Sequence, residues 1–391
     1  MHNFVLTTSR DREPALIAEL AMHGLTGHAT HRGAVRLRGS LEDGYRCCLW
    51  SRIAGRVLMP IGVVDASSAD ALYESTKRGP WSQHLSPDRT FAINVVGTNP
   101  VLRHPHFTAV RIKDAIVDQF RDKVGSRPSI DREQPDLRFH VLVDGRDAHI
   151  SLDLSGDPLH RRGLGRDGGP APLRETLAAA ILMTMQWPRL ATEGVPLVDP
   201  MCGSGTFLRE AAGYALDMAP GIHRDHWGFL RWPQHDANAW QRLLDEAEGR
   251  IRPTLDVPII GSDIDPNQVA RAQYNLAQAG LDEAVEVIEA DFSDLEVGVE
   301  GPGEPRGVLV MNPPYGERLG EQEDVEDLYA AIGDRLRQHW LGWTAFVLAG
   351  SKPLAAKLHL KSKQKTPLMN AQIDARLIEL PISTTPVNPK P

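Results

Sequence analysis

Residues 196–206, PLVDPMCGSGT, run from an apolar stretch into a turn that contains two glycines. Residues 207–219, FLREAAGYALDMA, continue with apolar side chains at helical spacing, so the sequence predicts a buried strand, a tight turn and a helix. Gly203 and Gly205 lack the Cβ atoms that would keep a ligand from the backbone, which favours a carboxylate or sugar site at the helix N-terminus. A plain turn would contain the same glycines. The glycine spacing and the lack of a following lysine exclude a phosphate loop.

The same alternation of strand and helix patterns continues to residue 350. Further strands are predicted at 257–263, 284–291, 307–314 and 344–350, and helices at 173–187, 268–280 and 325–340. Strands that alternate with helices require parallel crossovers, so we predict an α/β fold with a doubly wound sheet. Ligands of such sheets bind beyond the carboxyl ends of the strands, where the strand order reverses.

Acidic residues follow the second and third predicted strands of this region. Asp263, within GSDID at 261–265, can accept both hydroxyls of a ribose. Asp291 can accept the amine of an adenine, and Phe292 can cover the ring. Either aspartate taken alone would also serve as a helix cap. Their succession at strand ends favours an adenosine-containing cofactor held without a pyrophosphate grip, and S-adenosylmethionine fits best.

The fourth predicted strand ends in Asn312-Pro313-Pro314-Tyr315. Asn312 offers a side-chain carbonyl, and the two prolines stiffen the backbone so that the Pro313 carbonyl points into the same space. We predict that these two oxygens accept the hydrogens of an exocyclic base amine while Tyr315 stacks on the base. An ordinary strand-ending turn with a core tyrosine is the alternative interpretation.

The composition limits the class of protein. The length of 391 residues predicts two or three domains, and shares of 41% hydrophobic and 24% charged residues are typical of a soluble globular protein. The sequence contains no run of about 18 apolar residues, so no membrane span is expected. Charged residues interrupt the N-terminal segment where a signal peptide would be apolar, and we therefore expect a cytoplasmic protein. Cys47, Cys48 and Cys202 give no paired framework, so neither disulfides nor a metal site is expected.

The charge differs between the two parts of the chain. Residues 1–165 carry 22 Lys plus Arg against 19 Asp plus Glu, whereas the remainder carries 21 against 32. This asymmetry favours a nucleic-acid contact in the first part, although solvated faces would also produce it. Strand and helix patterns there predict α+β modules at 1–55 and 56–160, and a stretch rich in Gly, Arg and Asp at 161–172 predicts a linker. The predicted phosphate contacts are Arg103, Arg111, Lys113, Arg161 and Arg162.

Several segments resemble the THUMP-domain RNA guanine-N2 methyltransferases, especially those that act on 23S ribosomal RNA. The similar segments are DLSGDPLHRRG at 153–163, APLRETLAAAIL at 171–182, DPMCGSGTFLREAA at 199–212, APGIHR at 219–224 and NPPYGERLG at 312–320. FTAVRIKDAIVDQF at 107–120 resembles the helix of the THUMP module. The chain departs from the family pattern at Leu164, where an aromatic residue is usual, and at Ala371, where glycine is common.

The resemblance implies a fold and an activity. It implies a Rossmann-like class I methyltransferase domain with a seven-stranded doubly wound sheet at 173–391, preceded by a ferredoxin-like part at 1–55 and a THUMP-like part at 56–160. The implied reaction is methyl transfer from S-adenosylmethionine to the N2 of a guanosine, in ribosomal RNA or alternatively in transfer RNA. DNA adenine-N6 methylation uses a similar tetrapeptide, and a non-catalytic RNA-binding assembly protein would retain the same fold.

The predicted site residues follow from the motifs and the resemblance together. The predicted catalytic residues are Asn312, Pro313, Pro314 and Tyr315. The predicted cofactor-binding residues are Asp199, Cys202, Gly203, Ser204, Gly205, Thr206, Asp263, Ile264, Asp291, Phe292 and Asn312. The resemblance adds Pro172, Glu175 and Thr176 at the methionine end of the cofactor.

Overall fold

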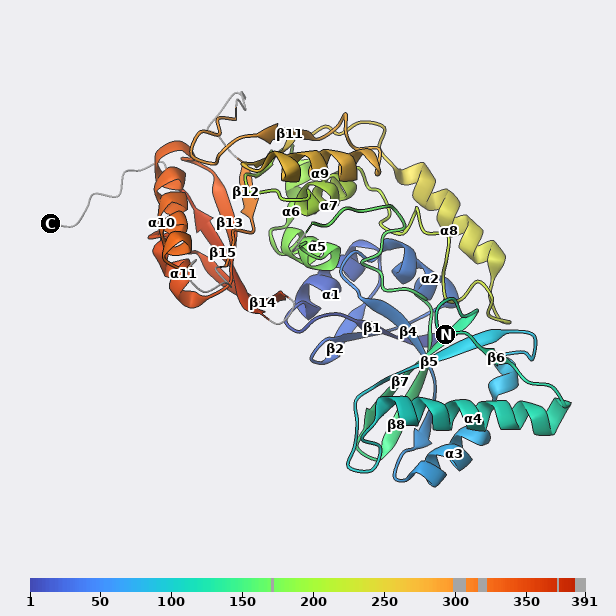
Figure 1. Ribbon diagram of the computed structural model, residues 1–391. Coiled ribbons are helices and arrows are strands. Elements are labelled where there is room, and N and C mark those ends of the chain that lie inside the picture. Colours follow the sequence, from blue (N-terminus) through green and yellow to red (C-terminus); the bar gives the residue numbers. More distant parts are fainter. Residues whose placement is uncertain (170–171, 298–306, 316–321, 371–372, 384–391) are drawn as a thin grey trace. The chain divides into compact units, whose positions relative to one another are not determined.

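The computed structural model describes residues 1–169, 172–297, 307–315, 322–370 and 373–383 (Figure 1). The chain forms two compact units, each assembled from segments that are distant in the sequence. Unit 1 contains residues 1–8, 20–163 and 221–248. Unit 2 contains residues 9–19, 164–220 and 249–391, as far as these are described. Ala371, one of the departures from the family pattern, lies outside the described residues.

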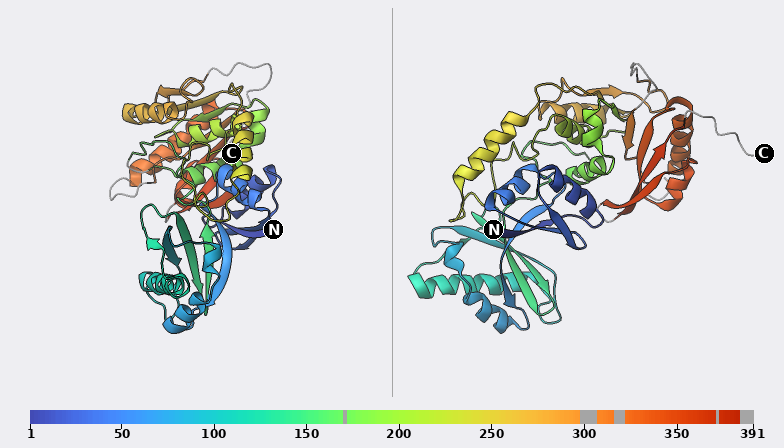
Figure 2. Two further views of the ribbon diagram at one scale, coloured as in Figure 1. Left: turned by 90° about the vertical axis from the view of Figure 1, so that its right-hand side faces the viewer. Right: turned by 180° about the vertical axis from the view of Figure 1, so that it is seen from behind.

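Unit 1 is built on one eight-stranded sheet with the strand order β2-β3-β1-β4-β8-β7-β5-β6. Its strands are β1 (His2–Thr7), β2 (Gly27–His31), β3 (Ala34–Gly39), β4 (Arg56–Asp65), β5 (Thr90–Val96), β6 (Ser129–Ile130), β7 (Leu137–Asp144) and β8 (Asp147–Asp153). Its helical elements are α2 (Leu41–Trp50), α3 (Ala69–Lys77), η1 (Trp81–Gln83) and α4 (Pro105–Val124). Two helices, α1 (Glu13–Met22) and α8 (Ala237–Arg250), extend across the division between the units. Helices α3 and α4 lie side by side against the sheet (Figures 1 and 2).

Strand β4 joins two modules that the sequence analysis treats as separate. Its first residues pair with β1, and the rest of the strand pairs with β8, where Val64 lies opposite Ala148. A bulge between Pro60 and Gly62 bends the strand between the two partners. Because both partners bond to the same strand, the sheet is continuous across the predicted boundary at residue 55.

Residues 221–248 belong to unit 1, although the sequence analysis places them within a domain at 173–391. The ring of Tyr45 in α2 packs on Phe229, with ring centroids 4.3 Å apart, and Trp240 of α8 meets Phe229 edge-on at 5.0 Å. Such aromatic pairs contribute about 0.5–1.5 kcal/mol each beyond their buried area. This aromatic cluster therefore holds the segment against the first part of the chain.

Unit 2 is built on a seven-stranded sheet with the order β11-β10-β9-β12-β13-β15-β14. Its strands are β9 (Leu197–Asp199), β10 (Ile259–Asp263), β11 (Glu286–Glu289), β12 (Val308–Met311), β13 (Thr344–Ala349), β14 (Gln364–Asn370) and β15 (Ile373–Pro381). Its helices are α5 (Glu175–Thr184), α6 (Trp187–Thr192), α7 (Thr206–Ala215), α9 (Pro266–Ala277), α10 (Gln322–His339) and α11 (Lys352–Lys357). Strands β9 to β13 pair in parallel, which confirms the predicted doubly wound sheet.

Two features of unit 2 differ from the sequence prediction. The helix predicted at 173–187 ends at Thr184, because Gln186 adopts a left-handed φ of 59° before the next helix begins. The resemblance implies seven strands, as the structure has, but the residue pattern does not locate β14 and β15, which form an antiparallel pair at the edge of the sheet. The left-handed backbone at Gln186 does not alter the spacing of the apolar residues, so the sequence pattern does not indicate the break between α5 and α6.

Strand β12, at the centre of the sheet, is buried on both faces. Val308 and Val310 of β12 face the core that α5, α7 and α9 cover, whereas Leu309 and Met311 face the core that α10 and α11 cover. Two-sided burial explains why the strand reads as a continuous apolar run. Among the residues that the structure describes, no helix is long and apolar enough to cross a membrane.

The strand order of unit 2 reverses at β9. Strands β10 and β11 lie on one side of β9, and β12 and β13 lie on the other. The crossover helices leave in opposite directions at such a point, so a crevice opens beyond the carboxyl ends of the strands. The strand-end motifs of the sequence therefore meet along one edge of the sheet.

Candidate functional site

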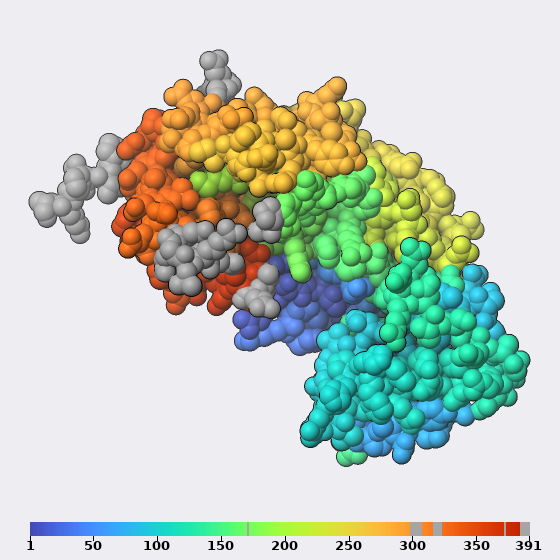
Figure 3. Space-filling view, in the orientation of Figure 1, coloured from blue at the N-terminus to red at the C-terminus, as the bar shows by residue number. Residues whose placement is uncertain are grey.

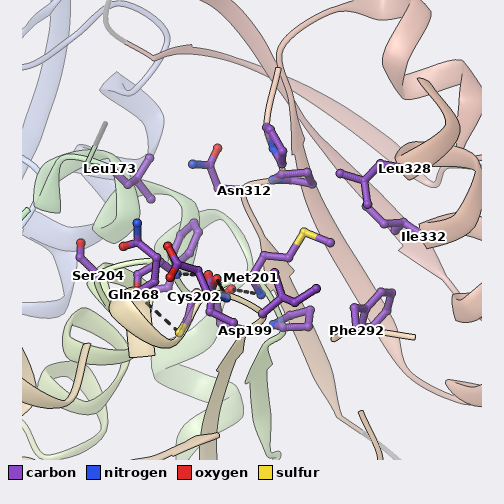
Figure 4. A pocket seen from close by; sticks show the side chains of 18 of the residues that line it. Leu173, Asp199, Met201, Cys202, Ser204, Gln268, Phe292, Asn312, Leu328 and Ile332 are labelled. Carbon is purple, nitrogen blue, oxygen red and sulfur yellow. Dashed lines mark hydrogen bonds between the residues drawn. The ribbon is translucent and has the colours of Figure 1, made fainter. Parts of the chain in front are cut away.

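A cavity of about 880 Å³ lies beyond the carboxyl ends of β9, β10, β11 and β12 in unit 2. In Figure 4, Phe292 lies on the side of Leu328 and Ile332, and Ser204 and Gln268 lie on the opposite side. The predicted site residues that line the cavity are Asp199, Cys202, Gly203, Ser204, Thr206, Asp263, Ile264, Asp291, Phe292, Asn312, Pro313, Pro314 and Tyr315. The four strand-end motifs thus share one cavity.

Asp199, the last residue of β9, carries a buried carboxyl group. Its side chain is 1% exposed, and its Oδ1 accepts a hydrogen bond from the backbone N–H of Met201 at 3.3 Å. Burial raises the pKa of Asp199 well above its ordinary value, and the neighbouring charge of Asp263 raises it further. A positively charged group bound beside Asp199 would lower that pKa and favour the ionised carboxylate.

The turn after β9 brings the backbone to the edge of the cavity. Gly203 has a φ of 52°, and a Cβ added there would meet no atom within 4 Å. Gly205 lies between two lining residues without lining the cavity itself, so its cofactor contact stays a prediction, and the structure adds a packing role. Its φ is 79°, and an added Cβ would lie 3.1 Å from the Cβ of Ala272 in α9. A side chain at position 205 would therefore separate α7 from α9.

Asp263, the last residue of β10, is bound to the backbone on both carboxylate oxygens. Its Oδ2 accepts the N–H of Gly203 at 2.9 Å, and its Oδ1 accepts the N–H of Asp265 at 3.0 Å. A carboxylate offers about four acceptor sites, so each oxygen keeps one lone pair for a further donor. Two acceptors on neighbouring oxygens match the two adjacent hydroxyls of a ribose.

The end of β11 combines a charged carboxylate with apolar side chains. Hydrogen bonds from Ser293, including its N–H to Asp291 Oδ1 at 2.7 Å, hold the pKa of Asp291 below its usual value. Phe292 stacks on Trp340, the residue directly after α10, with ring centroids 6.1 Å apart, and Ile264 lines the cavity with 66% of its surface exposed. A flat heterocycle with an exocyclic amine would find both apolar contacts and an acceptor here.

Asn312-Pro313-Pro314-Tyr315 follows β12 directly. The Tyr315 hydroxyl donates to Asn312 Oδ1 at 2.5 Å, and Nδ2 of Asn370 in β14 donates to Tyr315 Oη at 3.3 Å. Tyr315 is half-buried and packs against the core of unit 2 while it also lines the cavity. The oxygen predicted to accept a base amine therefore already receives one hydrogen bond from the protein, which the sequence analysis does not foresee.

Part of the predicted linker at 161–172 supports the cavity wall. Arg166 donates from Nη1 to Glu175 Oε1 at 2.6 Å. Glu175 and Thr176 are buried and are not among the lining residues, whereas Pro172 is. In the structure Glu175 is therefore engaged in an ion pair, and its place at the methionine end of the cofactor stays a prediction. Arg166 escapes the sequence analysis because a charged residue among glycines resembles a solvated linker.

The predicted phosphate contacts of unit 1 differ in what their side chains already bind. Arg162 is 5% exposed and donates to two backbone oxygens, so in this structure its guanidinium is engaged within the protein. Arg111 is engaged with Asp70, at 3.1 Å. Arg103 and Arg161 are exposed; Arg103 donates to the backbone oxygen of Pro100 at 2.8 Å, and Arg161 pairs with Asp157 at 3.6 Å.

Lys113 lines a second cavity, of about 420 Å³, which α4, β5, β6 and β7 surround. His106, Arg132 and Arg138 line the same cavity, and the sequence analysis does not single them out. The stretch of chain that contains these cavity residues, 92–138, is coloured cyan to green in Figure 3. These basic groups come from different elements, so no run of charge marks them in the sequence. Lys113 is ion-paired with Asp114, so a phosphate group in this cavity would share the lysine with that carboxylate.

The fold and the cavity define a class of protein. The doubly wound sheet, the acidic residues at two strand ends and the Asn-Pro-Pro-Tyr elbow at another are the features of a class I methyltransferase domain. In the part of the chain that the structure describes, no group of three or more His, Cys, Asp or Glu side chains is arranged to hold a metal ion.

Comparison with known families defines the domain more closely. The model of the RMKL-like methyltransferase domain matches residues 162–379, which is more than half of the chain, so the chain belongs to this family. The THUMP domain model matches residues 66–153, and the RlmL ferredoxin-like domain model matches residues 3–58. These matches confirm the resemblance inferred from the sequence.

Individual proteins are similar over most of the chain. The Ribosomal RNA large subunit methyltransferase K/L of Allochromatium vinosum is 43% identical over 385 residues, which are 97% of this chain and 52% of that protein. The chain thus spans about half the length of the curated relatives it matches. The structure of SMU.472, named as a methyltransferase and complexed with SAH, has a TM-score of 0.86 at 27% identity and covers 98% of this chain and 99% of that chain. A Listeria monocytogenes protein named a predicted N6-adenine-specific DNA methylase has a TM-score of 0.82 at 28% identity, and 97% and 96% are covered.

Proposed function

We propose that this chain transfers a methyl group from S-adenosylmethionine to the exocyclic N2 of a guanosine in 23S ribosomal RNA. The observation that carries the proposal is the convergence of Asp263, Asp291 and the Asn312 elbow on one cavity at the switch point of the sheet. The SAH complex of a structure with a TM-score of 0.86 supports the cofactor, and the name of the Allochromatium vinosum relative supports ribosomal RNA as the substrate.

The cavity provides a complementary group for each part of the cofactor. The free lone pairs of Asp263 would accept the ribose hydroxyls, and Asp291 would accept the adenine amine between Phe292 and Ile264. Asp199 would face a positively charged group of the cofactor and ionise as that group binds. When bound, S-adenosylmethionine supplies an electrophilic methyl group on a positively charged sulfur.

The elbow after β12 would activate the substrate amine. The lone pair of the guanine amine is delocalised into the purine ring and must be turned toward the methyl group. Asn312 Oδ1 keeps one lone pair beside the Tyr315 hydrogen bond, and together with the Pro313 carbonyl it would accept the two amine hydrogens. With both hydrogens held in this way, the lone pair of the amine would be aimed at the methyl group; the nitrogen would gain the methyl as the sulfur loses it, and the surplus proton would pass to solvent. No residue of the site needs to act as a strong base.

Unit 1 would hold the RNA while the target base enters the cavity of unit 2. A paired guanine hides its amine in the stack, so the base must be unpaired or flipped out before Tyr315 can stack on it. The basic cavity around Lys113, Arg132 and Arg138 would contact the RNA backbone. We expect the protein to act in the cytoplasm, where ribosomes are assembled.

Three other assignments use the same fold. The Listeria monocytogenes protein is named for DNA adenine-N6 methylation, which an Asn-Pro-Pro-Tyr elbow would also serve. The match of residues 66–153 to the THUMP domain favours RNA over DNA, but it is equally compatible with transfer RNA. A non-catalytic RNA-binding protein would not require the acceptor oxygen of Asn312.

The test is to incubate the purified chain and labelled S-adenosylmethionine with 23S ribosomal RNA, transfer RNA or DNA, and to identify the product nucleoside by mass spectrometry. The proposal expects N2-methylguanosine in 23S ribosomal RNA, together with loss of the same nucleoside from cells that lack the protein. N2-methylguanosine in transfer RNA alone, or N6-methyladenine in DNA alone, would overturn the choice of substrate. Tight cofactor binding without methylation of any of the three would overturn the enzymatic assignment.

A further inference from the structure

Asn370, the last residue of β14, lines the cavity and is hydrogen-bonded to the catalytic elbow. Its Nδ2 lies 3.3 Å from Tyr315 Oη, and that hydroxyl lies 2.5 Å from Asn312 Oδ1. In the strand order β12-β13-β15-β14, two strands separate the ones that end at the two asparagines. The tyrosine therefore bridges two strand ends that are not neighbours in the sheet.

The chemistry of the three groups fixes the direction of the hydrogen bonds. A side-chain N–H of Asn370 can only donate, so the Tyr315 oxygen is the acceptor of that bond. The single proton of the Tyr315 hydroxyl then remains for Asn312 Oδ1, which can only accept. The three side chains thus form a directed chain of hydrogen bonds that ends on the oxygen proposed to bind the base amine.

The surrounding structure holds the Asn370 end and the central tyrosine of this chain. The backbone oxygen of Met369, next to Asn370, accepts a hydrogen bond at 2.5 Å from the buried guanidinium of Arg12. The Tyr315 ring lies against Gly350, where an added Cβ would be 2.7 Å from Tyr315 Cγ. A larger residue at position 350 would displace the ring, so the close approach depends on glycine.

The structure assigns Asn370 a positioning role in methyl transfer, an inference that rests on the proposed function: through the Tyr315 hydroxyl, it keeps the carbonyl end of Asn312 turned toward the substrate amine. The two ends of a carboxamide have nearly the same shape, yet only the oxygen can accept an amine hydrogen. The Tyr315 hydroxyl donates to Asn312, so it selects the side-chain orientation in which Oδ1, and not the NH2 group, faces that hydroxyl. The second lone pair of that oxygen stays available for the substrate.

The first test compares two variants that remove one link each. Tyr315→Phe keeps the ring and removes the donated proton, and Asn370→Ala removes the donor that orients the hydroxyl. We expect Tyr315→Phe to lower the single-turnover rate about 2- to 10-fold, as expected for one neutral hydrogen bond, with the KM for RNA and the cofactor affinity unchanged. An unchanged single-turnover rate in Tyr315→Phe, or an effect of this variant on KM alone, would overturn the positioning role.

The decisive test is a double-mutant cycle. If Asn370 acts through the hydroxyl, Asn370→Ala has no further effect once Tyr315 is Phe. Asn370→Asp should be as slow as Tyr315→Phe, because the new carboxylate can only accept and would draw the hydroxyl proton away from Asn312. Losses that multiply in the double variant would overturn the proposal. Gln364→Ala, on the exposed part of the same strand, is the matched control and should be neutral.

A second measurement, by NMR, does not depend on methyltransferase activity. The side-chain amide of Asn312 gives its own 1H–15N signals, which should shift in Tyr315→Phe and in Asn370→Asp but not in Gln364→Ala. If these shifts occur and the wild-type chain methylates no RNA, the proposed function fails while the hydrogen-bond chain stands. If RNA is methylated and the signals of Asn312 do not respond, the positioning role fails and the proposed function stands.

Discussion

Replacing Asp263 by Asn tests the cofactor site with a change of one atom. The carboxylate accepts the N–H of Gly203 at 2.9 Å and that of Asp265 at 3.0 Å, and one lone pair on each oxygen remains for a ribose hydroxyl. An amide has one oxygen, so it can keep one of the two backbone bonds and one of the two ribose bonds. A hydrogen bond to a charged group contributes about 1.5–3 kcal/mol. Because about 1.4 kcal/mol corresponds to a factor of ten, the affinity for S-adenosylmethionine should fall about 10- to 150-fold.

Two measurements separate binding from folding in this variant. Isothermal calorimetry gives the cofactor affinity, and urea unfolding of the ligand-free protein gives the loss of stability from the lost backbone hydrogen bond. Asp282→Asn makes the same charge change at an exposed position of unit 2 outside the cavity, and it should leave both quantities unchanged. A cofactor affinity for Asp263→Asn within twofold of the wild type would refute the ribose contact, even if stability falls.

The remaining predictions concern the elbow, the buried acid, the division into units and the basic cavity. Asn312→Ala should slow single-turnover methyl transfer by about 10²-fold or more with unchanged calorimetric affinity for the cofactor, and an unaltered rate would exclude its role as acceptor. Burial raises the pKa of Asp199 in the folded state. The protonated carboxyl group therefore stabilises the fold fully below the unfolded-state pKa of about 3.9, and this stabilisation is lost as the pH rises through the folded-state pKa. The melting temperature of Asp199→Asn relative to the wild type should therefore increase from about pH 4 upward, and a difference independent of pH would contradict this. A chain of residues 164–391 keeps a segment whose aromatic partners lie in unit 1, so it should aggregate, and a monomeric product with cooperative unfolding would show the division to be wrong. Lys113→Glu should weaken RNA binding and reduce its salt dependence, whereas Arg127→Glu, exposed and outside the cavity, should change both less; equal effects in a titration at several salt concentrations would argue against the cavity.

Much of unit 2 could be predicted from the sequence because its signals are local. The apolar runs before Asp199, Asp263 and Asn312 are strands in the structure, and each motif lies within a few residues of its strand end. Parallel strands place their carboxyl ends on one edge, so predicting the fold also predicted which motifs share a cavity. The packing of Gly205 against Ala272 and the ion pair of Glu175 with Arg166 could not be predicted, because these contacts depend on neighbours in space and not on the motif.

The sequence by itself determined the alternation of strands and helices and the chemistry available at the strand ends, because periods of two and of about 3.6 residues are written in neighbouring positions. Only the tertiary structure decided that residues 221–248 join unit 1 and that one sheet runs across residue 55. It also decided that Asn370, 55 residues beyond Tyr315, orients the elbow. These contacts pair groups that lie far apart along the chain, and they form where burial of side chains repays the entropy of closing a long loop. The pattern of neighbouring residues therefore does not indicate where burial outweighs the entropy of loop closure.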